Sequence, residues 1–232
     1  MQEQLIVDGL SFELRRSNKR KTIGITIDRT GELVLSAPLD CPIEVMERVA
    51  RSKYRWIHSR LAQKELFLRA PVTHAFLDGE GFYYLGRSYR LRLVDSPLPD
   101  TSPLRLYRGW FELRHNEVHR GQEHFTNWYR EHGQQWLPQR VARFSGLVDA
   151  TPKGIKVQSL GYRWGSCGRN EVLHFHWRTM LFPFPIIDYI VVHELVHLHE
   201  PRHNRAFWQR VEQAMPDFAE RKQWLAENGS RY

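Results

Sequence analysis

Apolar and polar residues alternate along several short segments in the first half of the chain, a pattern typical of β-strands. The alternation over residues 21–36 surrounds Asp28-Arg29-Thr30-Gly31 and predicts a β-hairpin. A second β-rich stretch is predicted over about 81–114, with strands near FYYL, YRLRLV, LRLY and WFELR. The Pro-containing segment 95–103 is predicted to form a loop within it.

Apolar residues at helical spacing predict two long helices in the same half of the chain. The first opens at Pro42 and extends to about Arg69. Its predicted buried stripe consists of Ile43, Met46, Val49, Ile57, Leu61 and Leu68. The second covers about 117–147, and Pro138 within it favours a bend. The sequence shows no repeat and no low-complexity tract.

Strands and helices alternate again in the C-terminal third. Strands are predicted at about 154–159 and 171–178, on either side of the loop LGYRWGSCGRN. The most apolar helix of the chain follows Pro185, covers about 186–200 and ends at Pro201. Two further helices are predicted at about 204–214 and 217–227.

This order of elements indicates an α+β fold, because runs of strands are followed by helices that surround one buried helix. We expect an N-terminal β-rich region with one long helix over residues 1–117. A second region, of strands and helices, is expected over residues 118–232, and the two are expected to pack as one compact unit.

Composition narrows the class of protein. A solvated basic surface is the simpler explanation of the formal charge of +8, and the alternative is an anionic substrate or partner, nucleic acid included. Two cysteines, Cys41 and Cys167, are too few for a disulfide framework and suggest a reduced, cytoplasmic setting. We expect no secretory signal and no membrane segment, because the apolar stretch around 182–192 is short and interrupted by Pro183 and Asp188.

The run VVHELVHLHE contains the HExxH pattern His193-Glu194-Leu195-Val196-His197. On a helix, two histidines four residues apart share a face and can bind one metal ion, and Glu194 can reach a metal-bound water as general base. The surrounding residues are apolar on nearly all sides, so the helix should be buried. Unpaired polar groups are costly there, which favours a metal site over a chance match.

A catalytic zinc ion needs a third protein ligand. His199 points to the opposite side of the helix from His197. Pro201 reverses the chain, so His203 reaches the entrance of the next helix and can turn back toward the metal. Glu212 or Glu220 from a later helix remains an alternative ligand.

Three segments together resemble the YgjP-like family of zinc metallopeptidases, whose relatives include the SprT-like proteases. They are YRWGSC at 162–167, PIIDYIVVHEL at 185–195 and EPRHNRAFW at 200–208. The strong match covers about 155–210, and the N-terminal segment up to Pro38 is similar more weakly.

The resemblance implies a zincin-like metallopeptidase core, with the HExxH active-site helix beside a small β-sheet. The edge strand of that sheet would align an extended peptide or protein substrate. The resemblance also implies His203 as third ligand, because the family has a histidine four residues before a phenylalanine, here Phe207. One zinc ion per chain is the implied cofactor.

Several other residues are candidates for the substrate pocket. Arg163 could stabilise an oxyanion or bind a substrate carboxylate or phosphate, or else belong to a structural turn with its glycines. Cys167 is interpreted as an inert thiol rather than a nucleophile or an inhibitory metal ligand. Tyr189 shares a helix face with His193, although core packing is the simpler interpretation.

The remaining histidines lack ligand spacing. His174 and His176 share a strand face and could line a cleft or lie at the surface. We interpret His58, His74, His115, His119, His124 and His132 as surface residues.

The leading functional hypothesis is a zinc hydrolase of the peptidase type with Glu194 as general base and Arg163 at the oxyanion. The first alternative is a zinc-dependent hydrolase of a small anionic substrate, such as a nucleotide or another phosphate-containing molecule. The second is a nucleic-acid-associated protein with a structural zinc site. The basic cluster RRSNKRK at 15–21 supports the latter only weakly, since no aromatic platform accompanies it.

Overall fold

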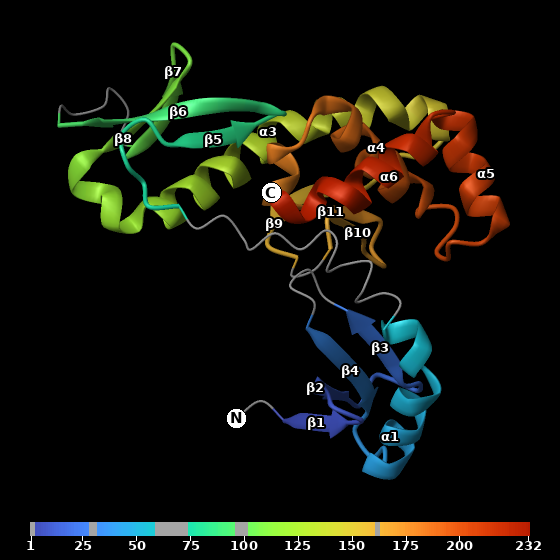
Figure 1. The fold of residues 1–232 in the computed structure, drawn as a ribbon. Coiled ribbons are helices and arrows are strands. Elements are labelled where there is room, and N and C mark those ends of the chain that lie inside the picture. Colours follow the sequence, from blue (N-terminus) through green and yellow to red (C-terminus); the bar gives the residue numbers. More distant parts are fainter. Residues whose placement is uncertain (1–2, 28–31, 59–73, 96–101, 161–162) are drawn as a thin grey trace. The chain divides into compact units, whose positions relative to one another are not determined.

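The computed structural model describes residues 3–27, 32–58, 74–95, 102–160 and 163–232. The chain divides into two compact units, one of residues 1–70 and one of residues 71–230 with Tyr232. Figure 1 shows the ribbon of both. Each unit has its own cluster of buried apolar residues. The boundary at 117/118 stays a prediction, although the strands over 81–114 share one core with the helices that follow them.

The first unit is a four-stranded sheet covered by a helix. Its elements are β1 (Gln4–Val7), β2 (Leu10–Ser17), β3 (Gly24–Ile27), β4 (Leu33–Pro38) and α1 (Ile43–Ser52). The strand order is β1-β2-β4-β3, with β2 and β4 parallel and the outer pairs antiparallel. The antiparallel pairing of β3 with β4 confirms the hairpin predicted over 21–36, whose turn at 28–31 lies outside the described residues.

The helix predicted from Pro42 to about Arg69 is interrupted. Helix α1 ends at Ser52, where the Lys53 amide bonds back to carbonyls of the last turn, and residues 54–58 are helical again. The part of the prediction beyond 58, with Leu61 and Leu68, lies outside the described residues. Ile43, predicted to be buried, is 44% exposed in the first turn, and the buried face of α1 is formed by Met46 and Ala50.

The second unit begins with a sheet of the same design. Strands β5 (Gly81–Tyr84), β6 (Arg87–Val94), β7 (Leu104–Tyr107) and β8 (Trp110–Arg114) confirm the four predicted strands and are arranged β5-β6-β8-β7. Figure 1 shows this sheet beside the N-terminal half of α3. The ring of Phe82 stacks on Phe125 of that helix, and Phe111 packs edge-on against Trp128.

The two four-stranded sheets are topological copies of each other, contrary to the expectation of no repeat. In both sheets, the inner strands of two antiparallel hairpins pair with each other in parallel, and a helix follows the last strand. Residues 9–15 (GLSFELR) and 86–92 (GRSYRLR) occupy the same place and share Gly, Ser, Leu and Arg. The shared glycines, Gly9 and Gly86, both have positive φ in a tight turn, which explains their presence.

The rest of the second unit carries a three-stranded sheet and most of the helices. Its elements are η1 (His115–Arg120), α3 (Gly121–Val148), β9 (Gly154–Gln158), β10 (Gly165–Cys167), β11 (Val172–His176), η2 (Trp177–Leu181), α4 (Phe184–Val196), α5 (Arg205–Ala214), α6 (Phe218–Asn228) and η3 (Gly229–Arg231). The small sheet has the order β10-β11-β9. The class is α+β, as predicted.

Three boundaries differ from the prediction in this region. The segment LGYRWGSCGRN, predicted as a loop, includes the short edge strand β10, because Gly165–Cys167 pair antiparallel with residues 173–175 of β11. The strand predicted to 178 ends at His176, where a 3-10 turn starts. The buried helix ends at Val196 rather than 200, since the amides of residues 198 and 199 bond three residues back in a tighter turn.

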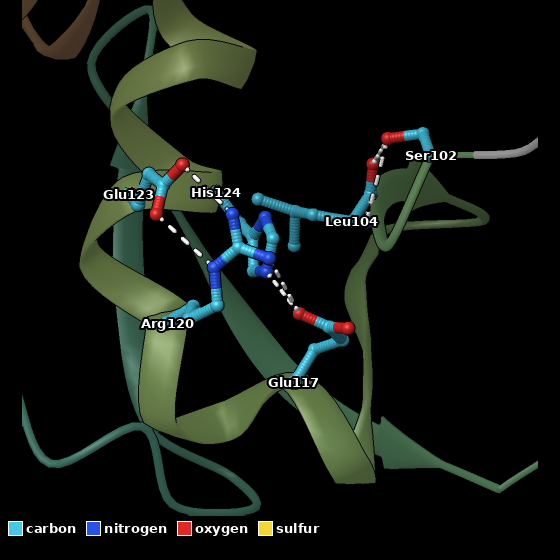
Figure 2. Close-up of polar contacts among 6 residues, drawn as sticks. All are labelled: Ser102, Leu104, Glu117, Arg120, Glu123 and His124. Carbon is cyan, nitrogen blue, oxygen red and sulfur yellow. Dashed lines mark hydrogen bonds and ion pairs between the residues drawn. The ribbon is translucent and has the colours of Figure 1, made fainter.

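Three histidines predicted at the surface are partly or fully covered. His124 is 9% exposed, and its Nε2 lies 2.7 Å from the Glu117 carboxylate, which satisfies the buried ring (Figure 2). Arg120 pairs with both Glu117 and Glu123 beside it. His132 is half-buried against Trp128, and His74 is half-buried beside Glu80. The exposed positions of His58, His115 and His119 agree with the prediction.

Among the described residues, no helix is both long enough and apolar enough to cross a membrane.

Candidate metal centre and cleft

Helix α4 supplies the central residues of the site from within the hydrophobic core. Pro183 is its N-cap and Pro185 lies in its first turn, where a missing amide hydrogen costs nothing. Ten of its thirteen residues are buried, including the run Ile186–Val192. A helix buried on every side is held in a fixed position, so the polar side chains at its C-terminal end are also fixed.

An ion pair with α3 anchors this helix. Asp188 is buried, and both of its carboxylate oxygens accept hydrogen bonds from the Arg140 guanidinium. The two side chains are only 12% and 18% exposed, so the pair is shielded from solvent. It bridges α3 and α4 one turn before His193 along α4.

Three histidines meet at the end of α4. One ligand nitrogen from each of His193, His197 and His203 lies within 4.8 Å of the others. The Nε2 atoms of His193 and His203 are 2.9 Å apart. Two nitrogens bound to one tetrahedral zinc ion at about 2.1 Å lie about 3.4 Å apart, so small rotations of these rings would fit one ion.

The local structure orients two of the three rings. His197 is the C-cap of α4, and its Nδ1 lies 3.0 Å from the Glu200 carbonyl oxygen, to which it donates when protonated. That bond leaves Nε2 for a metal. His203 precedes Asn204, the N-cap of α5, whose side chain accepts from the Phe207 amide and donates to Glu200. The cap fixes the turn that carries His203.

Burial keeps these imidazoles neutral. Burial lowers the pKa of His193, and repulsion from positive charge at His197, His203 and Lys222 acts in the same direction, so that this pKa is about 3. Burial also lowers the pKa of His197 and that of His203. Neutral imidazole is the form that binds metal, so all three rings are suited to that role at pH 7. Among the described residues, the buried Nδ1 of His193 has no hydrogen-bond partner.

Glu194 is buried beside the histidines, at 5% exposure. Burial raises its pKa to about 8, while the Arg163 charge and a hydrogen bond from the Cys167 amide act in the opposite direction. Its Oε2 has no hydrogen-bond partner among the described residues. One side of the carboxyl group is therefore held by the backbone of β10, and the other is available to a ligand.

Gly165 is the residue whose role was missed from the sequence. A Cβ atom at this position would lie 2.5 Å from Oε1 of Glu194 and 2.6 Å from its Cγ. Gly165 is in an extended strand, so its role is to permit close approach and not to adopt a special backbone angle. The spacing of Gly165 from Glu194 in the sequence carries no signal of this contact.

A cavity of about 780 Å³ adjoins these residues. One wall is the continuous run Arg163–Arg169 with β10, and the other is formed by the end of α4. Arg163 and Tyr189 both line it, and the ring of Tyr189 lies 5.9 Å from that of His193. Burial raises the pKa of Tyr189 to about 12, helped by the charge of Glu194, so its hydroxyl stays protonated.

Cys167 also lines the cavity but is not among the clustered metal ligands. Burial raises the pKa of its thiol, and the charges of Glu194 and Glu171 raise it further. The thiol therefore stays protonated at neutral pH, which suits the inert interpretation better than a nucleophile.

The other candidates lie elsewhere. The His199 ring lies within 3.2 Å of the carbonyl oxygens of Val148 and Asp149 at the end of α3. His174 and His176, expected in a cleft or at the surface, do not line the cavity; His176 is buried and accepts from the Arg178 amide. Neither Glu212 nor Glu220 belongs to the histidine cluster.

The sequence model of a known family, described as the YgjP-like metallopeptidase domain, matches residues 21–228. The chain belongs to the YgjP-like family. At the level of the family it is a metal-dependent peptidase. The substrate that follows from membership is a peptide or protein, and a metal is implied as cofactor.

Two other comparisons add little to the YgjP-like assignment. Among solved structures, the metallopeptidase zymogen abylysin of Pyrococcus abyssi is similar at 16% identity and a TM-score of 0.36. The similarity covers 38% of this chain and 90% of that one. No curated protein matches the chain.

Proposed function

We propose that the chain is a zinc-dependent metallopeptidase with a zincin-like core, acting in the cytoplasm. The proposal rests on one observation. Three histidine nitrogens lie within 4.8 Å of one another, beside a buried carboxyl group of which one oxygen has no hydrogen-bond partner among the described residues.

His193, His197 and His203 would hold the ion, one per chain. Three imidazoles with a fourth position left to the substrate are the ligand set of many catalytic zinc sites. When bound, zinc would polarise the scissile carbonyl and lower the pKa of the attacking water and of Glu194. Ligand chemistry favours zinc over manganese, which prefers oxygen ligands.

Glu194 would accept the proton of the attacking water at Oε2 and pass it to the leaving amine. The Cys167 amide holds the carboxylate against β10, so the base is oriented before substrate arrives. The absence of a side chain at Gly165 leaves room for this contact.

Arg163 would stabilise the negative charge that develops on the carbonyl oxygen. It lines the cavity, and its charge already acts on Glu194. The Tyr189 hydroxyl would be a second donor, on the α4 side, since its raised pKa keeps it protonated.

The substrate would be an extended peptide beside β10. This strand is at the edge of its sheet and pairs with β11 on one side only, among the described residues. Its residues Gly165–Cys167 are part of the cavity wall. An edge strand can add an extended chain through backbone hydrogen bonds, which requires no particular peptide sequence.

Metal analysis and proteolysis of the same samples test this proposal. We expect about one zinc per chain in the wild type and a loss or marked decrease in His193→Ala and in His203→Ala. Glu194→Gln should keep its zinc but cleave unfolded casein at least about 100-fold more slowly. Zinc lost only in His193→Ala would exclude His203 as ligand. Absence of zinc uptake by the wild type would contradict the whole proposal.

One observation favours a second substrate class, a phosphate-containing small molecule. Arg163 and Arg169 both line the cavity. Phosphate release from nucleotides, lost in Glu194→Gln, together with no casein cleavage, would favour this alternative.

A further inference from the structure

The sheet β5-β6-β8-β7 packs one face on α3, and the residues that β6, β7 and β8 present on the other face are exposed or partly exposed, apart from Glu112. Its inner face carries Phe82, Leu91 and Phe111, which are buried against α3. Cross-strand register assigns the alternate residues to the opposite face, here called the outer face. On β6, β7 and β8 the outer face includes Arg90, Arg92, Arg105, Tyr107, Trp110 and Glu112.

Arginine and aromatic side chains stack on one another across this face. The Arg92 guanidinium lies 4.5 Å from the ring centroid of Trp110, and that of Arg105 lies 4.5 Å from Tyr107. Arg108, in the turn between β7 and β8, lies 5.1 Å from the same tyrosine ring. These contacts hold planar groups in place before any ligand arrives.

The outer face is strongly positive. Glu112 is its only acidic residue among those named, and its side chain is 9% exposed beneath Arg105, at 2.7 Å. Arg92 lies further from Glu112, at 3.9 Å, with half of its side chain exposed. Arg90 and Arg108 are exposed and form no ion pair among the described residues. The buried carboxylate thus neutralises one arginine and leaves a net excess of cations.

The topological copy in the first unit shows that the fold does not require this composition. Strand pairing places Arg90, Trp110 and Tyr107 in one row across the second sheet. The equivalent row of the first sheet is Glu13, Val34 and Thr26. The next row is Arg92, Glu112 and Arg105 in the second sheet and Arg15, Ser36 and Gly24 in the first. Stability of the sheet alone therefore does not account for the arginines and aromatic rings.

We propose that the outer face binds single-stranded nucleic acid. Exposed Arg90 and Arg108 would contact phosphates, and the arginine–aromatic layers offer planar surfaces on which unpaired bases stack. A duplex keeps its bases stacked inside and would use only the charges. A lipid surface offers no flat rings that could stack on the guanidinium groups and aromatic side chains of this face. This activity is independent of the metal site and goes beyond peptide hydrolysis.

Fluorescence anisotropy with a labelled 20-nucleotide single-stranded DNA tests the proposal, using the full chain over a range of salt. We expect Arg90→Ala/Arg108→Ala to weaken binding and to reduce the salt slope by about 1.4, since each lost phosphate contact contributes about 0.7. Tyr107→Ala should weaken binding about tenfold with little change in slope, and Tyr107→Phe should stay within about twofold of wild type.

The control variant Arg130→Ala/Arg210→Ala removes the same charge from exposed positions on α3 and α5. It should retain binding within about twofold, as should Glu194→Gln, and thermal unfolding verifies that each variant is folded. Equal losses in the two double-arginine variants would overturn the proposal. The proposal would also be overturned if Tyr107→Ala bound the DNA with unchanged affinity and polyphosphate displaced the DNA completely. Binding to anionic vesicles without binding to the oligonucleotide would identify a membrane surface instead.

Discussion

At the residue scale, the position of Glu194, the proposed general base, depends on the absence of a side chain at Gly165. In Gly165→Ala the new Cβ would overlap Oε1 of Glu194, so the carboxyl group must move away from the Cys167 amide. We expect casein cleavage to fall by about 100-fold or more, as for loss of a general base, with zinc content unchanged. The matched control is Gly154→Ala in the same sheet, where the nearest atom would be 3.8 Å away. Full activity in Gly165→Ala would show that Glu194 is not held as described.

Burial of Glu194 also predicts how pH affects the stability of the metal-free protein. Its folded pKa of about 8 lies above the ordinary glutamate value of 4.5, so its contribution to stability is largest below pH 4.5 and is lost as pH rises toward 8. Glu194→Gln removes this loss. We expect the variant, with metal chelated, to gain up to a few kcal/mol over wild type between pH 5 and pH 8. Urea unfolding at several pH values measures the difference, and a gap that does not grow with pH would contradict it.

The residues that could be predicted from sequence are those whose chemistry depends on local spacing. His193, Glu194 and His197 sit on one helix, so their proximity follows from helical geometry. The position of His203 could also be anticipated from the sequence, because Pro201 and the start of the next helix restrict where this residue can lie. Gly165 and Arg140 were missed, because each acts on a partner far away in sequence and only tertiary packing brings them together.

At the scale of elements, the Arg140–Asp188 pair predicts how firmly α4 is fixed. Asp188→Ala leaves the Arg140 guanidinium largely buried without its partner, and we expect a loss of about 3 kcal/mol in the free energy of unfolding. The double variant Arg140→Met/Asp188→Leu should recover most of that loss, because neither charge remains. Urea denaturation measures both. A double variant as unstable as Asp188→Ala would mean that packing, rather than the unpaired charge, is responsible.

Elements with a long pattern of apolar residues were predicted correctly from the sequence. The element that is a strand only because another strand pairs with it was not. The strands β5–β8 and the buried helix α4 were recognised from their apolar patterns, whereas the three-residue strand β10 was assigned to a loop. Gly165-Ser166-Cys167 has no apolar alternation, and it is a strand only because β11 pairs with it. This short strand nevertheless holds Glu194 through the Cys167 amide, so the weakest sequence signal belongs to an element next to the proposed active site.

At the scale of the whole molecule, the chain combines two sheets of one topology with different roles for their helices. In the first unit the helix after the sheet only covers it. In the second unit α3 continues past the sheet and packs against α4, which carries the histidines. The repeat was not recognised in the sequence, because the two sheets share their strand order but differ in most side chains. The cross-strand rows of their outer faces show this difference.

The two possible boundaries of the metal-binding part predict different fragments. The core around the histidines includes Phe82, Leu91 and Phe111 from the sheet, so residues 71–232 contain all of it and residues 118–232 do not. We expect the fragment 71–232 to unfold cooperatively and to bind about one zinc, whereas 118–232 should lack a cooperative transition, since three large buried side chains are each worth about 2–3 kcal/mol. Circular dichroism and zinc titration of both fragments measure this. A folded, zinc-binding fragment 118–232 would instead support the boundary at 117/118, and would mean that the second sheet is an addition to the metal-binding core and not part of it.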